Sequence, residues 1–262
     1  MKELVRISRE QLPLFLFVLV RMSGLVLITP IFGHRNVPLM AKVGLSVMLA
    51  LLVVPFCSGQ NIRTDSLLSI TVSILGEFCV GLILGYLSLL FFSIGLMAGQ
   101  IIDVELGLGI GSIFDPQMGM QSSISGMFLD LGLLLYFLIS NGHHRLLRIL
   151  AGSLRQVPPG TVRLTAQLAL LVADSFCRFF ALTVSLMLPF ICSGLLTEVI
   201  MGILMRAMPQ MNAYMVGIPF KVLTGLILLF LLQPLFAPFC NLVFDQLFDA
   251  ATKALRLMGG TS

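Results

Sequence analysis

Long apolar runs, separated by short polar connections, dominate this chain from end to end. Several of them reach or exceed the roughly 20 residues that an α-helix needs to cross the hydrocarbon core of a bilayer. The third and fifth are longer than one crossing requires, and Pro189 lies inside the fifth, so we expect these two to tilt, kink or break. The six apolar segments are residues 12–32, 39–56, 67–97, 127–139, 164–196 and 216–239. This pattern predicts an all-α, polytopic membrane-type protein forming a single domain.

The last apolar segment passes into a stretch with a different periodicity. In residues 242–258 the charged side chains recur three or four positions apart, which places them on one face of a helix. We therefore expect the C-terminal part to be an amphipathic helix whose polar face meets solvent or lipid headgroups. The residues of that face are Asp245, Asp249, Lys253 and Arg256.

Composition supports a membrane location. Hydrophobic residues make up 58% of the chain and charged residues 11%, against about 25% charged residues in soluble domains. The 16 Lys and Arg residues are scattered, so we expect no basic face for nucleic acid. With a cytoplasmic N-terminus, ten of these cations fall in connections on the cytoplasmic side and three on the opposite side. This asymmetry predicts six crossings with both termini inside.

Seven ionisable residues lie within or at the edges of the apolar runs. At roughly 3 kcal/mol each at a helix centre, exposing all of them to lipid would cost on the order of 20 kcal/mol. Asp174 and Arg178 are four residues apart, acid first, and predict an intrahelical ion pair. For the others, two explanations stay open, namely pairing between helices or subunits and an ion or substrate path. The seven residues are Arg21, Glu77, Asp130, Asp174, Arg178, Glu198 and Lys221.

Residues 99–121 interrupt the apolar runs with five glycines and three acids. The glycines are not followed by the Gly-Lys-Ser/Thr of a phosphate loop, and the acids lack the spacing of an EF-hand. The stretch from Ser123 to Gly126 lacks the first glycine of a nucleophile elbow. The five cysteines are widely spaced without a CxxC pair, which is typical of buried free thiols. We therefore expect no enzymatic activity, no cofactor and no bound metal.

Glycine pairs four residues apart occur three times, a spacing that lets helix backbones approach closely. We expect these pairs to pack against other helices, in this chain or in a neighbouring one. The pairs are Gly81 with Gly85, Gly95 with Gly99, and Gly107 with Gly111.

Four stretches, in this order, resemble the flagellar biosynthetic protein FliR family, a component of the bacterial type III export gate. They are RMSGLVLITPIFGHRNVPLMAKVGLS (21–46), AGQIIDVELGLGIGSIFDPQMG (98–119), FLISNGHHRLLRIL (137–150) and LMRAMPQMNAYMVGIPFKVLTGL (204–226). The likeness spans nearly the whole chain, and the last block is similar to the flagellar rather than the injectisome branch.

The resemblance implies a FliP-like part, residues 1–190 with a pore loop at 106–122, fused to a FliQ-like helical hairpin and C-terminal amphipathic helix, residues 191–262. It implies assembly with FliP and FliQ, next to FlhB, in the inner membrane at the flagellar basal body. Unfolded flagellar subunits would pass through the shared channel, and lipids would surround part of the complex. The residues expected to contact other subunits are Pro209, Gln210, Asn212 and Lys221.

By the same resemblance, the loop contributes a plug across the pore. Its glycines allow backbone conformations closed to other residues, and its apolar side chains supply bulk that seals around varied chains. Asp103, Glu105 and Asp115 would anchor the ends of the segment. The alternative is a simple glycine-rich turn between packed helices. The expected plug residues are Gly107, Gly109, Ile110, Gly111, Ile113, Phe114, Met118 and Met120.

Other functions stay open from the sequence alone. A virulence injectisome component is the nearest alternative, because the two export systems are homologous. A small-solute channel or transporter would explain the charges within apolar runs, although no inverted repeat is visible. A membrane scaffold without a pore would place the glycine-rich loop away from any channel axis.

Overall fold

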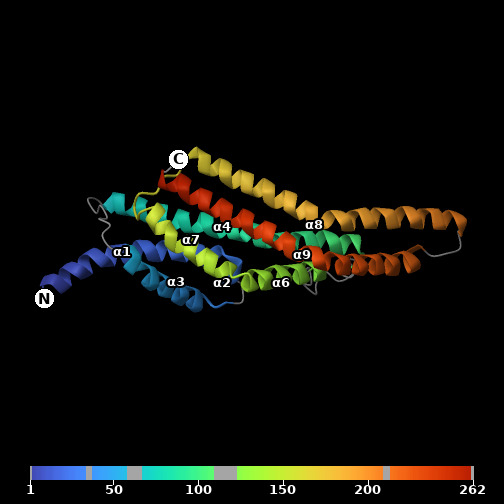
Figure 1. Cartoon of the computed structure of the whole chain (residues 1–262), viewed down its shortest axis with the longest axis horizontal. Coiled ribbons are helices and arrows are strands. Elements are labelled where there is room, and N and C mark those ends of the chain that lie inside the picture. Colours follow the sequence, from blue (N-terminus) through green and yellow to red (C-terminus); the bar gives the residue numbers. More distant parts are fainter. Residues whose placement is uncertain (1, 34–36, 58–66, 109–122, 209–212, 261–262) are drawn as a thin grey trace. The chain divides into compact units, whose positions relative to one another are not determined.

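The computed structural model describes residues 2–33, 37–57, 67–108, 123–208 and 213–260, and every secondary-structure element in these ranges is a helix (Figure 1). The all-α prediction is confirmed. The elements are α1 (Lys2–Ile28), α2 (Pro30–Gly33), α3 (Leu39–Val53), the 3-10 helix η1 (Val54–Cys57), α4 (Leu67–Glu105), α6 (Ile124–Ile139), α7 (Gly142–Gln156), α8 (Ala166–Ala207) and α9 (Ala213–Gly259).

Three helices are much longer than one membrane crossing requires. Helices α4, α8 and α9 contain 39, 42 and 47 residues, against the roughly 20 that a bilayer core needs. Helix α8 continues through Pro189 without a break. Helix α9 runs from the last apolar segment into the predicted amphipathic tail, so the tail is the end of the same helix.

The helix lengths do not match six crossings. Within the described ranges, three helices are long and apolar enough to span a membrane, or four if α6 and α7 count as one bent span. The apolar parts of α1 and α3, residues 12–28 and 39–53, are shorter. Pro30 lies just beyond the end of α1, and the residue before a proline disfavours the α conformation. The first apolar run is therefore divided by a proline, which a count of apolar residues ignores. Helix α3 passes directly into η1 at Val54, whose backbone is still helical.

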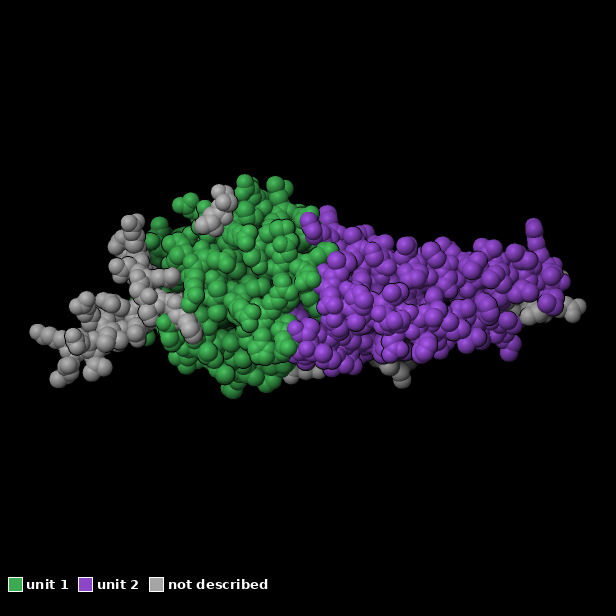
Figure 2. Space-filling model, in the orientation of Figure 1, with its two compact units in different colours: residues 1–91, 141–176, 244–262 green, residues 92–140, 177–243 purple. Residues whose placement is uncertain are grey.

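The chain forms two compact units (Figure 2). Unit 1 contains residues 1–91, 141–176 and 244–262, and unit 2 contains residues 92–140 and 177–243. Each of the three long helices contributes one part to each unit.

In unit 1, helices α1 and α4 approach at backbone distance. Gly81 of α4 lies directly against the Arg21 carbonyl of α1, and a Cβ on Gly24 of α1 would stand 2.9 Å from the Phe78 carbonyl oxygen of α4. A Cβ on Gly85 would stand 3.2 Å from the Leu25 carbonyl oxygen. The predicted close packing at Gly81 and Gly85 is confirmed, because no larger residue would leave room for the facing backbone.

A buried polar network also holds unit 1 together. The Arg21 guanidinium of α1 donates from Nε to Glu77 Oε2 of α4 (2.6 Å), from Nη1 to Ser153 Oγ of α7 (3.1 Å) and from Nη2 to the Val157 carbonyl (3.0 Å). The Gly160 amide donates to the other Glu77 oxygen (2.9 Å). Both charged side chains are fully buried, and this set of bonds pairs the charge that burial would otherwise leave unsolvated.

Unit 2 joins the end of α4 to α6 and to a hairpin of α8 and α9. Phe92 of α4 and Phe137 of α6 meet edge to face, with ring centroids 5.1 Å apart. Gly217, near the start of α9, faces the Met201 side chain near the end of α8. The two arms of the hairpin therefore run antiparallel.

The described cysteines are free, but they are not uniformly buried. Cys240 is buried and Cys79 half-buried, whereas Cys177 and Cys192 of α8 are exposed. The prediction of buried thiols is wrong for these two. Helix α8 turns apolar residues outward as well as inward, so an apolar surrounding in the sequence does not imply burial within this chain.

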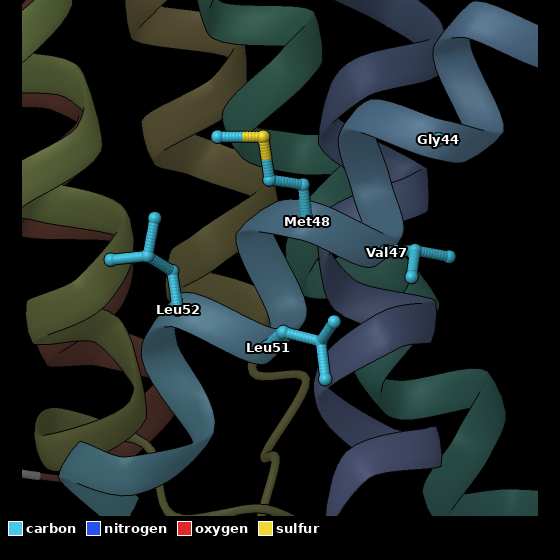
Figure 3. Close-up of a pocket in the computed structure, with 5 residues that line it drawn as sticks. All are labelled: Gly44, Val47, Met48, Leu51 and Leu52. Carbon is cyan, nitrogen blue, oxygen red and sulfur yellow. The ribbon is translucent and has the colours of Figure 1, made fainter.

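Helix α3 carries a shallow apolar groove on its outer side. The groove has a volume of about 460 Å³. Figure 3 shows four of its lining side chains projecting from α3 beside Gly44. They belong to Val47, Met48, Leu51 and Leu52.

Candidate functional site

The predicted plug segment begins where a glycine ends α4. Gly107 adopts a left-handed conformation with φ of 72°, which glycine reaches without the steric cost that other residues incur. Its amide donates to the Val104 carbonyl (3.1 Å), and the Leu108 amide donates to the Asp103 carbonyl (2.9 Å). This pair of bonds is the Schellman motif, in which a glycine follows the last helical turn. Gly107 thus lies beyond α4, and its partner in the third predicted glycine pair, Gly111, lies outside the described residues.

The segment ends where two side chains cap α6. Ser123 Oγ accepts a hydrogen bond from the Gly126 amide (2.8 Å), as N-cap serines do. The buried Asp103 carboxylate of α4 accepts a bond from the Ser125 amide (3.1 Å). A negative charge there is also favoured by the helix dipole. The prediction that Asp103 anchors the segment is confirmed.

Glycines bring the two helices on either side of the segment into direct contact. Gly99 of α4 lies against the Gly126 backbone of α6, and a Cβ on Gly95 would stand 2.9 Å from the Asp130 amide nitrogen. The predicted packing at Gly95 and Gly99 is confirmed. The chain therefore leaves α4 and enters α6 at one place, which we call the loop base and define as residues 103–108 and 123–126.

The loop base also contacts the hairpin of unit 2. The Glu105 side chain lies across Gly194 of α8, and the Leu106 side chain lies on Gly225 of α9. Leu106 is 4% exposed.

One turn from each of these glycines, an ion pair joins the two arms of the hairpin. Lys221 Nζ of α9 lies 2.7 Å from Glu198 Oε1 of α8. Together with Arg21 and Glu77, this pair supports pairing between helices as the explanation for four of the seven ionisable residues.

The remaining predicted site residues have different outcomes. Gly107 lies at the loop base, whereas its seven partners in the predicted plug lie outside the described residues, as do Asp115 and three of the four predicted subunit contacts. Asp174 and Arg178 lie one turn apart on α8 and are both exposed, and their mutual ion pair stays a prediction. The predicted plug and subunit-contact residues that lie outside the described ranges are Gly109, Ile110, Gly111, Ile113, Phe114, Met118, Met120, Pro209, Gln210 and Asn212.

Sequence reasoning missed the two contacts with the hairpin and the capping role of Ser123. A serine directly before an apolar helix is an N-cap signal that could have identified Ser123. No local signal predicts that Glu105 and Leu106 meet Gly194 and Gly225, because these partners are about 90 and 120 residues away along the chain. Within the described ranges, no three His, Cys, Asp or Glu side chains gather in a way that could hold a metal ion.

Comparison with known proteins gives full-length similarities. The profile of a family described as "Bacterial export proteins, family 1" matches residues 12–247. The chain is 30% identical to the flagellar biosynthetic protein FliR of Bacillus subtilis over 253 residues, covering 94% of this chain and 96% of that protein.

Two other relatives mark the range of the similarity. FliR of Escherichia coli is 27% identical over 250 residues, covering 94% of this chain and 95% of that protein. The secretion system apparatus protein SsaT of Salmonella typhimurium is 28% identical over 160 residues, covering 61% of this chain and 62% of that protein. The similarity thus extends further along the chain for the two flagellar relatives.

Proposed function

Because the chain belongs to the bacterial export proteins of family 1, and within them to the flagellar FliR proteins, we propose that it is a component of the flagellar type III export gate. Unfolded flagellar subunits cross the inner membrane through the channel that it forms with FliP and FliQ, next to FlhB. Its role is structural rather than catalytic. The observation that carries this proposal is the match to FliR over 94% of the chain.

A second candidate is the corresponding component of a virulence injectisome. The similarity to SsaT favours it, because that relative is a secretion system apparatus protein. The SsaT match covers only 61% of this chain, whereas each of the two flagellar matches covers 94%. This difference supports the flagellar assignment.

Exposed apolar surface supports assembly with other subunits. In α9, only 6% of the most apolar 18-residue stretch is buried within this chain. Side chains such as Leu223, Leu226 and Phe230 are more than half exposed. Exposed apolar area on this scale marks contact with lipid or protein, and partner subunits and the inner membrane would cover it.

We further propose that the segment from Gly107 to residue 122 closes the channel. Its two ends are held together at the loop base by the Asp103 bond to Ser125 and by the contact of Gly99 with Gly126. A chain of 16 residues that must return to its origin reaches at most about 26 Å from it. That reach is enough to lie across a channel that admits an unfolded polypeptide, while the anchored ends stay in place.

One experiment tests both the function and the gate. In a flagellated strain lacking its own FliR, this chain is expected to restore swimming and to co-purify with FliP and FliQ. A variant without Ile110–Met118 keeps the described anchors, so it should still co-purify but should make the membrane leak small ions. Swimming motility, pull-down and membrane conductance are the measurements.

The matched control is Gly202→Ala on α8, because a Cβ added at this glycine would have no atom of the chain within 4 Å. It should restore swimming without a leak. Failure of the unaltered chain to co-purify with FliP and FliQ would contradict the assembly. Unchanged conductance of a deletion variant that does co-purify would contradict the gate.

A further inference from the structure

Arginines from three segments of the chain lie at one end of unit 1. Helix α7 and the last part of α9 run in the same direction there (Figure 1). Near the start of α7, Arg145 pairs with Asp245 of α9. At the other end, a Cβ on Gly259 of α9 would lie directly against the carbonyl of Gln156, the last residue of α7. The two helices therefore end side by side, and each has one arginine in its last turn. These are Arg155 and Arg256.

The third arginine belongs to the connection between α7 and α8. The Arg163 amide donates to the Met258 carbonyl in the last turn of α9 (3.2 Å). Its guanidinium nitrogen Nη1 lies 3.6 Å from the place where a Cβ on Gly260 would stand. Arg163 is thus held beside the end of α9. We call Arg155, Arg163 and Arg256 the arginine cluster.

The positive charge of the arginine cluster is not neutralised by the described part of the chain. All three side chains belong to exposed residues, and the ion pairs of the described residues include none of them. The two acids that the last part of α9 exposes are already paired with other cations. These pairs are Arg145 with Asp245 and Lys253 with Asp249.

Stabilisation of helix ends explains only part of the arginine cluster. The helix dipole favours a cation in the last turn of a helix, which accounts for Arg155 and Arg256 individually. It does not account for Arg163, because this residue lies in a connection outside any helix. The gathering of three exposed cations therefore favours a negatively charged ligand.

The ends of three candidate membrane spans lie in the same unit as the arginine cluster. Spans begin at Leu68 in α4 and at Ala166 in α8, and a third ends at Gly259 in α9. The connection that carries Arg163 also lies against the first turns of α4, because a Cβ on Gly76 would stand 3.3 Å from Val162. Cations at the ends of membrane spans lie near the headgroups of the lipids.

Exposed apolar side chains lie next to the arginine cluster. Leu164 directly follows Arg163 and is 61% exposed. On α4, Val72 and Leu75 lie within one turn of Gly76, and both are more than half exposed. An acidic protein segment or a free phosphate ion would leave these side chains in water. A phospholipid supplies a phosphate group and apolar chains in one molecule.

We propose that the arginine cluster binds the phosphate group of an anionic phospholipid, whose acyl chains lie against the exposed apolar side chains of α4 and α8. Guanidinium groups bind phosphate oxygens through charge-assisted, often bidentate, hydrogen bonds. A lipid with a net negative charge is favoured over a zwitterionic one, because no cation in its headgroup offsets the phosphate. This site lies in unit 1 and does not depend on the export function proposed above.

The test titrates phosphatidylglycerol into the full chain in a mild detergent and follows the midpoint of thermal unfolding, which a ligand of the folded state raises. We expect phosphatidylglycerol to raise the midpoint and phosphatidylcholine to leave it unchanged. Arg163→Gln and Arg256→Gln should each weaken the apparent affinity about fivefold, the contribution of one cation near an anionic lipid surface. Arg163→Lys keeps the charge and should weaken it less.

The matched control is Arg206→Gln. Arg206 is also an exposed arginine in the last turn of an apolar helix, but it lies on α8 in unit 2. The variant should bind phosphatidylglycerol as the unaltered chain does. Because all the substituted side chains are exposed, the midpoints of the variants without lipid should equal that of the unaltered chain, which separates lost binding from lost folding.

Four results would overturn the site. The first is an equal response to phosphatidylglycerol and phosphatidylcholine, and the second is a loss of affinity in Arg206→Gln as large as in Arg163→Gln. The third is unchanged affinity when Arg155, Arg163 and Arg256 are all replaced by glutamine. The fourth is an equal rise of the midpoint with inorganic phosphate or with polyglutamate at the same concentration, which would indicate a site for free phosphate or for an acidic protein.

Discussion

Arg21 and Glu77 show how a charge is accommodated inside an apolar helical protein. Neither side chain is exposed, and each oxygen of the carboxylate accepts one bond. The remaining guanidinium donors reach Ser153 and the Val157 carbonyl. The pair thus connects α1, α4, α7 and the segment after α7. Removing one partner leaves the other charge buried, which costs more than the pair itself contributes.

At this scale we predict that Glu77→Gln strongly destabilises unit 1. Glutamine has the same shape but no charge, so Arg21 would be left as an uncompensated buried cation, at a cost of about 3–5 kcal/mol. The measurement is the free energy of unfolding in detergent. Asp249→Asn is the control, because the Asp249–Lys253 pair is about half exposed and should be worth less than about 0.5 kcal/mol. Equal effects of the two substitutions would refute the role of the buried network.

At the scale of helices, glycine contacts decide which faces pack. The Gly99 contact with α6 is backbone to backbone, so rotating a side chain cannot make room for a larger residue there.

Helix α7 packs through apolar side chains and not through glycines. Its leucines at positions 146, 150 and 154 are buried at helical spacing, while Arg145 pairs with Asp245 of α9 at 2.9 Å. His143 and His144 lie in the first turn of the same helix.

For these helices we predict that Gly99→Ala separates α4 from α6. Overpacking costs typically about 1–3 kcal/mol, and here the facing atoms belong to the rigid backbone. Gly44→Ala on α3 is the matched change, because its Cβ would meet open space. It should be neutral or stabilising by up to about 1 kcal/mol. The midpoint of thermal unfolding measures both, and a Gly99→Ala protein as stable as Gly44→Ala would contradict the packing.

At the scale of the whole molecule, apolar surface remains uncovered by the chain itself. Helices α8 and α9 expose large side chains along much of their length, and α3 carries an open apolar groove. A soluble monomer rarely exposes contiguous apolar patches of this kind. The stability of the present protein therefore depends on the partners or lipids that bind it.

We predict that co-expression with FliP and FliQ shields α8. Cys177 and Cys192 are exposed in the single chain, whereas Cys240 is buried. In detergent, maleimide should label the two exposed thiols of the chain alone, label them several-fold more slowly in the assembled complex, and leave Cys240 unmodified in both. Equal labelling of the chain alone and of the complex would show that subunits do not cover α8.

The sequence by itself determined the helical class, the membrane-type character and the amphipathic end of α9. Each depends on local properties, namely the length of an apolar run and the 3.6-residue period of polar positions. The ordered motifs also suffice to indicate the family, to which the similarity over 94% of the chain assigns it. The sequence also predicted Asp103 as an anchor and Gly95 and Gly99 as packing positions.

Only the tertiary structure decided which distant residues meet. It paired Arg21 with Glu77 and Lys221 with Glu198, and it seated Leu106 on Gly225. Such partners are separated by tens of residues, and their meeting depends on how whole helices pack rather than on any local pattern. The same holds for exposure: Cys177 and Cys240 both lie in apolar sequence, yet the packing of α8 and α9 leaves one outside and encloses the other.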